Sequence, residues 1–238
     1  MATINPTDAP RRSFVYRKLL DANATFDSLG DGAIATNLPD VDAEAVERMA
    51  VSDLSGLPRI GFKGRDTLDW LRARGFECGN TPNRTYRQPN GVLAALLAPN
   101  EVLLLSPLAG PDLTLLGLAD TCSLDDEIRR YPVPRADANF EFLVSGRHAA
   151  EMFAKLCGVD LRPAAFAADG VAQTSVARLN AIVVRADVGD ILAFRILGDS
   201  ASAEYMWESL KDAMSEFSGG HCQTKSDQLK GRNPGTVR

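Results

Sequence analysis

The stretch GLPRIGFKGRDTLDWLRARG, Gly56–Gly75, is the first candidate for a phosphate-binding turn. An apolar run meets Gly61 and Gly64 before a helical pattern, a place where backbone amides can surround an anion. A Walker loop needs Lys and then Ser or Thr after its last glycine, whereas Arg65 and Asp66 follow Gly64. The dinucleotide pattern GxGxxG is also incomplete. Because Asp66 in the first turn already satisfies the helix dipole, we predict a structural turn from strand to helix.

The sequence offers little material for nucleophilic or metal-dependent catalysis. His148 falls in the first turn of a predicted helix and His221 in a polar tail, and neither belongs to a nucleophile motif such as GxSxG. Four cysteines are scattered without a CxxC pair, namely Cys78, Cys122, Cys157 and Cys222. We therefore predict free thiols, no zinc site, no disulfide framework and no catalytic residues in this chain.

One pair of neighbouring carboxylates could act as general acid and base. Asp125 and Asp126 stand together in CSLDDEIRRYP. Glu127 and then Arg129-Arg130 follow at once, which is more typical of a solvated, charge-compensated helix end. The second interpretation is the one we adopt.

Two short polar sets flank predicted strands. In PVPRADANFEFLVSG, Pro132 and Pro134 fix an extended segment, after which Arg135 and Asp137 precede a strand. In VAQTSVARLNAIVVR, Gln173 and Arg178 lie close to a strand end. These four residues could orient a ligand or set the register of a partner chain. Alternatively, an arginine paired with a nearby carboxylate pins the linker.

Amphipathic helices and antiparallel hairpins must position these residues. The clearest helix runs between Ser200 and the stop at Gly219-Gly220, and one face of it carries Ala203, Met206, Trp207, Leu210, Met214 and Phe217. Further helices are predicted near 146–157, after Gly64 and near 42–50. Two apolar runs about Pro99-Asn100 and two about Val188-Gly189 predict hairpins. In the second hairpin, Phe194 and Arg195 compete with their neighbours for the inner face. The pattern indicates an α+β fold.

The opening stretch has a weak second copy. IGFKGRDTLDWLRARG at 60–75 resembles FLVSGRHAAEMFAKLCG at 142–158, with the pairs Gly64-Arg65 and Gly146-Arg147 at matching places. A hairpin follows each copy. We predict two pseudo-repeated β-α-β-β units with antiparallel sheets packed against helices.

Composition and patterning divide the chain into parts. Residues 1–12 are predicted to be a flexible N-terminus, and 219–238 a disordered tail. The folded domain spans 13–218, with parts 13–106 and 138–218 joined by a long connection at 107–137. The net charge of -5 and the absence of like-charge runs argue against a nucleic-acid partner. Apolar stretches are too short for a bilayer and the N-terminus is not a secretory signal, so we expect a cytoplasmic protein.

Five stretches together resemble a known family. DLSGLPRIGFKG, YPVPRADA, KLCGVDLRP, VAQTSVARLNAIVVR and DSASAEYMWESL are similar to the gamma subunit of heterotetrameric sarcosine oxidase, and equally to the small GcvT-like subunit of N-methylglutamate dehydrogenase. The resemblance covers about residues 13–218. The wider relatives are the aminomethyltransferase T-proteins of glycine cleavage, which share the pattern of Asp53, Leu54, Ser55 and Gly64.

The resemblance implies a GcvT N-terminal-like fold and an accessory role. Such complexes demethylate secondary amines and pass the one-carbon unit to tetrahydrofolate. FAD, FMN, NAD and tetrahydrofolate are expected in the partner subunits, the larger alpha chain together with beta and delta, and none in this chain. The four residues Arg135, Asp137, Gln173 and Arg178 are then linker or interface contacts.

One departure from the T-protein pattern bears on folate. T-proteins carry an acidic residue that contacts the folate amine, and the corresponding region here has no Asp or Glu from Arg84 to Pro99. The first carboxylate, Glu101, falls in the hairpin turn. The resemblance therefore favours a non-catalytic subunit of an amine oxidoreductase. The alternative is a free-standing tetrahydrofolate-binding aminomethyltransferase-like protein.

Overall fold

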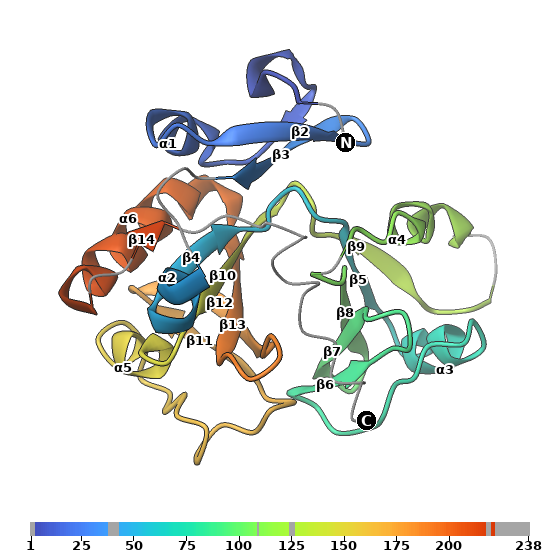
Figure 1. Cartoon of the computed structure of the whole chain (residues 1–238). Helices are drawn as coiled ribbons and strands as arrows, with labels where there is room; N and C mark the ends of the chain where they lie inside the picture. Colours follow the sequence, from blue (N-terminus) through green and yellow to red (C-terminus); the bar gives the residue numbers. More distant parts are fainter. Residues whose placement is uncertain (1–2, 38–42, 109, 124–126, 218–219, 222–238) are drawn as a thin grey trace, which may run out of the picture.

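The computed structural model of the chain describes residues 3–37, 43–108, 110–123, 127–217 and 220–221. Three sheets organise these residues. Figure 1 shows a small N-terminal sheet above two larger sheets that stand side by side, with α2, α5 and α6 outside one of them and α3 and α4 outside the other. The mixed architecture with antiparallel sheets agrees with the predicted α+β class.

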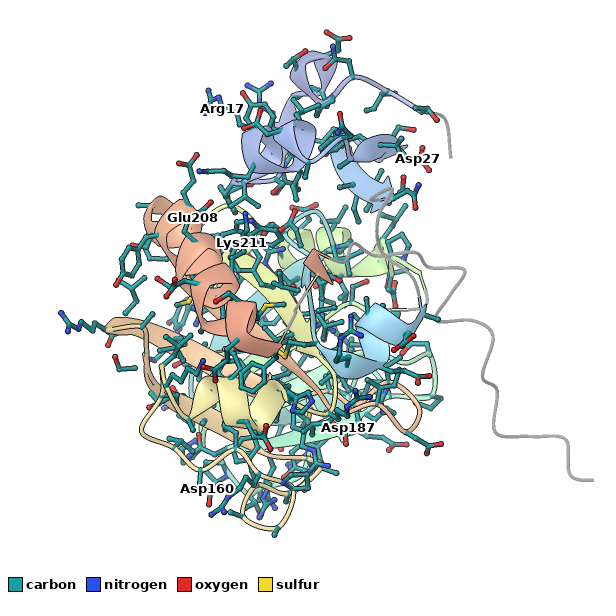
Figure 2. The ribbon with its side chains drawn as sticks, turned by 60° about the vertical axis from the view of Figure 1, so that its left-hand side comes forward. Arg17, Asp27, Asp160, Asp187, Glu208 and Lys211 are labelled. Carbon is teal, nitrogen blue, oxygen red and sulfur yellow. The ribbon has the colours of Figure 1, made fainter. Side chains whose placement is uncertain are left out.

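The N-terminal sheet has the strand order β1-β3-β2, formed by β1 (Arg11–Arg12), β3 (Gly32–Asn37) and β2 (Thr25–Leu29). A 3-10 turn at Pro6–Asp8 precedes it, and α1 (Tyr16–Asp21) lies between β1 and β2. Residues 3–12, predicted to be flexible, thus include a turn and a strand paired to Gly32 and Ala33. Lys18 of α1 forms an ion pair of 3.1 Å with Glu208, which Figure 2 shows on α6.

The two larger sheets are called the β5 sheet and the β10 sheet, after the first strand of the path that each follows. The β5 sheet has the order β6-β7-β8-β5-β9. Its strands are β5 (Arg59–Lys63), β6 (Arg84–Arg87), β7 (Leu93–Ala98), β8 (Glu101–Leu105) and β9 (Tyr131–Pro134). The β10 sheet has the order β11-β12-β13-β10-β4-β14. Its strands are β4 (Ala50–Asp53), β10 (Asn139–Ser145), β11 (Val171–Val176), β12 (Leu179–Arg185), β13 (Ala193–Asp199) and β14 (Gly220–His221).

Both larger sheets follow the same path from strand to helix to three antiparallel strands. In one, β5 leads through α3 (Thr67–Arg72) to β6, β7 and β8; in the other, β10 leads through α5 (Ala149–Phe153) to β11, β12 and β13. The two predicted hairpins are β7–β8 and β12–β13. Each helix is followed by three strands rather than the predicted two. The extra strands, β6 and β11, are short and carry polar residues, so their apolar signal is weak.

Each sheet also receives a strand from the segment that precedes the other. β4 comes just before β5 in the chain but pairs with β10, and β9 comes just before β10 but pairs with β5. The segment 107–137, predicted to be a connection, therefore contains strand β9 as well as the short helix α4 (Thr114–Gly117). Pro132 and Pro134 are extended as predicted, and they are tolerated because β9 is an edge strand.

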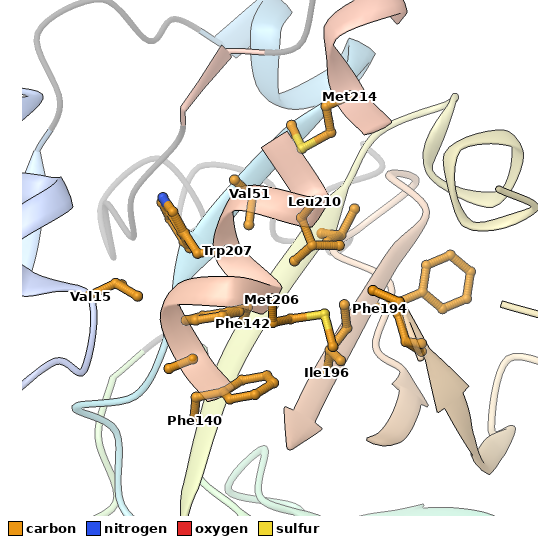
Figure 3. Packing of buried hydrophobic residues seen from close by; sticks show 14 of the residues in the cluster. Val15, Val51, Phe140, Phe142, Phe194, Ile196, Met206, Trp207, Leu210 and Met214 are labelled. Atoms are coloured by element: carbon orange, nitrogen blue, oxygen red, sulfur yellow. The ribbon is translucent and has the colours of Figure 1, made fainter. Parts of the chain in front are cut away.

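The largest core lies between the β10 sheet and its helices. α6 (Ala203–Met214) buries Ala203, Met206, Trp207, Leu210 and Met214, as its spacing predicts, and Phe217 packs partly against the same cluster. Figure 3 shows Met206, Trp207 and Leu210 over Phe142 and Ile196 of the sheet. The Trp207 ring meets the Phe142 ring edge-on at 5.1 Å. A smaller cluster, which includes Phe62, Trp70 and Leu71, fills the space between α3 and the β5 sheet.

Gly64 and Gly146 occupy equivalent strand-to-helix turns. Their φ angles are +144° and +120°, which favour glycine. A Cβ on Gly64 would stand 2.1 Å from the Arg129 carbonyl oxygen, and one on Gly146 would stand 2.5 Å from that of Arg48. The predicted structural role of Gly64 is confirmed.

Two further predictions concern the helix near 42–50 and the C-terminal tail. The helix predicted near 42–50 is present as α2 (Ala43–Arg48). Of the tail predicted to be disordered, Gly220–His221 pairs with β4 as β14, and the rest lies outside the described residues. Among the helices in the described ranges, none has the length and apolar character needed to cross a bilayer.

Candidate functional site

Arg135 joins the end of β9 to the start of β8. Its Nη2 donates to Glu101 Oε1 at 2.9 Å, and its Nη1 donates to Asn139 Oδ1 at 3.4 Å. Glu101 also forms an ion pair with Lys63, whose Nζ lies 3.2 Å from Glu101 Oε2. These contacts match the interpretation in which an arginine paired with a carboxylate pins the linker.

Gln173 connects the two larger sheets from β11. Its Nε2 donates to Leu97 O at 2.7 Å and to Asn83 Oδ1 at 3.0 Å. Gln173 and Arg135 line the same cavity of about 830 Å³, together with Asn139, Asn180 and other residues of β9 to β13. The structure therefore brings two of the four predicted residues together.

Asp137 and Arg178 lie elsewhere. Asp137 is exposed, and its Oδ1 accepts a hydrogen bond of 2.6 Å from Arg11 of β1. It lines a separate cavity of about 220 Å³ beneath the N-terminal sheet. Arg178 is exposed in the β11–β12 turn at φ +68°, and within the described ranges its side chain makes no hydrogen bond or ion pair. The four residues do not form one site.

A buried charge cluster between the sheets was missed by sequence reasoning. Glu141 of β10 accepts from Arg195 Nε of β13, and its second oxygen lies 3.8 Å from Arg59 Nη1 of β5. The side chains of all three residues are at most 1% exposed. The signal was present, because Glu141 and Arg195 are lone charges inside apolar strands, NFEFLVS and LAFRILG.

The arginines of this Arg59–Glu141–Arg195 cluster also donate hydrogen bonds to backbone carbonyls. Arg59 donates to the carbonyls of Ser55 at 2.9 Å, Leu57 at 3.0 Å and Ala136 at 2.8 Å, and also to that of Asn139. Arg59 thus ties the β4–β5 turn to the β9–β10 connection. Burial lowers the pKa of Arg59, and the Glu141 charge opposes that shift.

Asp53 of β4 lies beside this cluster and is 2% exposed. Burial raises the pKa of its carboxyl, against hydrogen bonds from Ser13 and Ser55 and the charge of Arg59. The Ser55 amide donates to Asp53 Oδ1 at 3.1 Å. Asp53 therefore holds the turn that carries the DLSG pattern.

The middle of the space between the two larger sheets is apolar. This inter-sheet cluster consists of Leu93, Ala95, Leu97, Leu103, Leu105, Val171, Val184, Ala186 and Leu197. The first three lie on β7, in the stretch predicted to correspond to the folate-contacting region of T-proteins. No carboxylate from β7 enters this space, since the strand reads LAALLA.

The remaining chemical candidates have ordinary structural surroundings. His148 Nδ1 lies 2.9 Å from Glu151 Oε2, and its ring stacks on Phe217. Cys78, Cys122 and Cys157 are free thiols as predicted, and burial raises the pKa of Cys78. Cys222 lies outside the described residues. Among the described residues no group of His, Cys, Asp and Glu could hold a metal ion.

The acidic stretch near residue 125 has a partial outcome. Asp125 and Asp126 lie outside the described residues, so both interpretations stay predictions. Arg130, which we placed in a solvated helix end, is 2% exposed. Its guanidinium lies over the Trp70 ring at 5.4 Å and donates to the Ile128 carbonyl. That part of the prediction is wrong, because Arg130 immediately precedes β9 and packs under α3.

Comparison with known proteins identifies the fold. A chain of heterotetrameric sarcosine oxidase from Corynebacterium sp. U-96, in complex with pyrrole 2-carboxylate, has a TM-score of 0.60 and 22% identity, over 74% of this chain and 89% of that chain. Glycine cleavage system aminomethyltransferase T from Bartonella henselae has a TM-score of 0.67 and 12% identity, over 92% of this chain. This chain spans 62% of that transferase. No family model and no curated protein matches the sequence. The chain therefore has a GcvT-like fold.

Proposed function

We propose that this chain is the accessory, GcvT-like gamma subunit of a heterotetrameric flavin-dependent amine oxidoreductase of the sarcosine oxidase or N-methyl amino acid dehydrogenase type. The complex demethylates secondary amines in the cytoplasm and hands the one-carbon unit to tetrahydrofolate. FAD, FMN, NAD and tetrahydrofolate bind the alpha, beta and delta partners, and this chain supplies a scaffold without catalytic residues.

The observation that carries the proposal is an exposed apolar segment. Within the described ranges, six large apolar side chains are exposed, and four of them lie between residues 113 and 131. These are Leu113 at 50%, Leu116 at 46%, Ile128 at 43% and Tyr131 at 45%. A contiguous patch of exposed apolar side chains is typical of a surface that another protein covers, and we propose that these four side chains belong to one such patch.

Two further features support a scaffold. The apolar inter-sheet cluster occupies the middle of the space between the two larger sheets, and no carboxylate of β7 reaches it. The Arg59–Glu141–Arg195 cluster is engaged largely with backbone carbonyls that fix turns. The fold match to a chain of a heterotetrameric complex is consistent with a subunit role.

We also propose that the two larger sheets with their helices are pseudo-repeats. Their strand orders correspond, and Gly64 and Gly146 stand at the same turn with positive φ. Shared path and shared backbone conformation at a matching sequence position support duplication of one unit.

The test is co-expression of the tagged full chain with the large flavoprotein subunits of a sarcosine oxidase-type complex. We expect a stable complex that carries flavin, whereas the chain purified alone carries none. Leu113→Asp with Leu116→Asp should disrupt the complex, and Leu20→Asp, a 39% exposed leucine on α1, is the matched control. Assembly that is unchanged in the double variant would overturn the proposed interface.

The alternative is a free-standing tetrahydrofolate-binding protein of the aminomethyltransferase type. The cavity of about 830 Å³ favours it, because Arg135, Asn139 and Gln173 place polar groups beside the apolar Ile182 and Leu197. Calorimetric titration of the isolated chain with tetrahydrofolate decides between the two. Saturable binding that Gln173→Ala weakens supports the alternative, and no binding supports the subunit.

A further inference from the structure

A second opening between the larger sheets lies at the other end of β12. This cavity of about 340 Å³ is bounded by the β6–β7 turn and by the β12–β13 turn. The larger cavity touches β12 at Leu179–Ile182, whereas this one begins at Ala186, just after the strand ends. The inter-sheet cluster contributes Leu93 and Ala186 to its floor.

Strand register directs two arginines into this opening from opposite sheets. Arg87 of β6 pairs with Leu93, and Arg195 of β13 pairs with Val184. Cross-strand partners project from the same face of a sheet. Because Leu93 and Val184 both belong to the inter-sheet cluster, Arg87 and Arg195 both face the space between the sheets. Both line the cavity.

Arg195 is buried but incompletely paired. It is 1% exposed; its Nε donates to Glu141, and its Nη1 donates to the Ser106 carbonyl at 2.8 Å. Its Nη2 is shielded from solvent and has no hydrogen-bond partner among the described residues. Glu141 is also shared with Arg59, so two buried guanidiniums contact a single carboxylate there. A buried donor without an acceptor is costly, and an anion relieves that cost.

The other charged groups leave the cavity open to an anion. Arg87 is exposed at the rim, and within the described ranges its side chain has no hydrogen bond or ion pair. Asp187, labelled in Figure 2, also lines the cavity. Its two carboxylate oxygens accept hydrogen bonds of 2.8 to 3.1 Å from Arg185, and the Ala193 amide also donates to it, so its charge is already paired. The remaining walls are mostly apolar and include Pro107, Leu108 and Val188.

We propose that this cavity binds a small molecule with one carboxylate and an apolar body, the carboxylate lying between Arg195 and Arg87 and the body against Pro107, Leu108 and Val188. A carboxylate can accept charge-assisted hydrogen bonds from Arg195 Nη2, which has no other partner among the described residues, and from the Arg87 guanidinium. The apolar walls provide for the rest of the ligand. This inference is independent of the proposed subunit role.

The experiment is an NMR titration of the full chain with benzoate, with neutral benzamide as the matched probe of the same shape. We expect saturable benzoate binding in the millimolar range, with shifts in the amides of residues 88–92 and 186–192. Benzamide should cause no saturable shift there. The Arg87→Gln variant should weaken benzoate binding by about tenfold, because it removes a charge-assisted hydrogen bond.

The control for this variant is Arg84→Gln on the same strand. Arg84 pairs with Leu96 and therefore lies on the other face, where it forms an ion pair with Asp169. Benzoate affinity should be unchanged in it. We avoid Arg195 variants because they leave Glu141 buried with one partner fewer. Three results would overturn the proposal. Benzamide could shift the same amides as much as benzoate does, or Arg87→Gln could bind benzoate as tightly as the unchanged chain. The third is that inorganic phosphate binds at this cavity and benzoate does not.

Discussion

The β10 sheet and the β5 sheet follow the same chain path, but the hydrophobic clusters on their outer faces differ in size and composition. The outer face of the β10 sheet is covered by α5 and α6 over a cluster rich in Phe, Met and Trp. The outer face of the β5 sheet is covered by α3 over a smaller cluster. Leu113, Leu116 and Tyr131, which lie between the end of β8 and the end of β9 in the chain, are exposed. The chain path is the same in both halves, but the β10 half holds the larger buried cluster and the β5 half leaves several large apolar side chains exposed.

The first prediction tests this asymmetry with one tryptophan from each half. Trp207→Ala should lower the free energy of unfolding by about 3–5 kcal/mol, because the residue packs inside the largest cluster. Trp70→Ala should cost about 1 kcal/mol less, since its cluster is smaller and can collapse more completely. Urea unfolding of both variants measures the difference. Equal losses would show that both halves share the stability evenly.

The joint between the halves gives the second prediction. Glu141→Gln removes the carboxylate that the buried Arg59 and Arg195 both contact and should cost about 3 kcal/mol of unfolding free energy. Glu101→Gln weakens only partly exposed pairs with Lys63 and Arg135 and should cost about 1 kcal/mol or less. Chemical denaturation measures both. If Glu101→Gln lowers the unfolding free energy as much as Glu141→Gln does, the buried cluster does not contribute more to stability than the partly exposed ion pairs.

The third prediction compares the two glycine turns. Gly64→Ala and Gly146→Ala should each destabilise the chain by about 1–3 kcal/mol, because each adds a Cβ at positive φ against a backbone carbonyl. Thermal unfolding measures both, and Gly75→Ala is the control because it tests positive φ without a close neighbour. A neutral Gly146→Ala would break the equivalence of the two turns.

The fourth prediction concerns pH and Asp53 on β4, the strand that precedes β5 yet pairs with β10. Its raised pKa means that the folded chain keeps a proton which the unfolded chain has already released. The stabilisation is complete below the unfolded pKa and is lost as the pH rises through the folded one. Asp53→Asn should therefore flatten the decline in stability as the pH rises from the unfolded pKa to the raised one. A decline of unchanged slope in denaturation at several pH values would exclude Asp53 as its source.

The comparison also shows what could be predicted from the sequence. The α6 stripe, the two hairpins and the Gly64 turn follow from local periodicity and glycine chemistry. β6 and β11 were missed because RTYR and VAQTSV draw their stability from neighbouring strands rather than from their own apolar pattern. The exchange of β4 and β9 between the sheets was missed because local patterns do not specify which strand pairs with which.

The candidate site was predicted only in part, for a similar reason. Arg135 and Gln173 were selected as polar residues near strand ends, and they do line one cavity. Arg195 was seen only as a competitor for the inner face. Its partner Glu141 lies 54 positions away and its carbonyl acceptor Ser106 lies 89 positions away. Pairing across such separations depends on the assembled sheets, so no local motif announces it.

Hydrogen–deuterium exchange of the full chain, alone and in complex with the co-expressed flavoprotein subunits, tests the central claim most directly. The account predicts slower exchange on complex formation in peptides covering residues 113–131, and unchanged exchange in α5 and in the β11–β12 turn. A complex that protects those β10-sheet elements and leaves residues 113–131 unchanged would contradict the assignment of the contact surface to the β5 half.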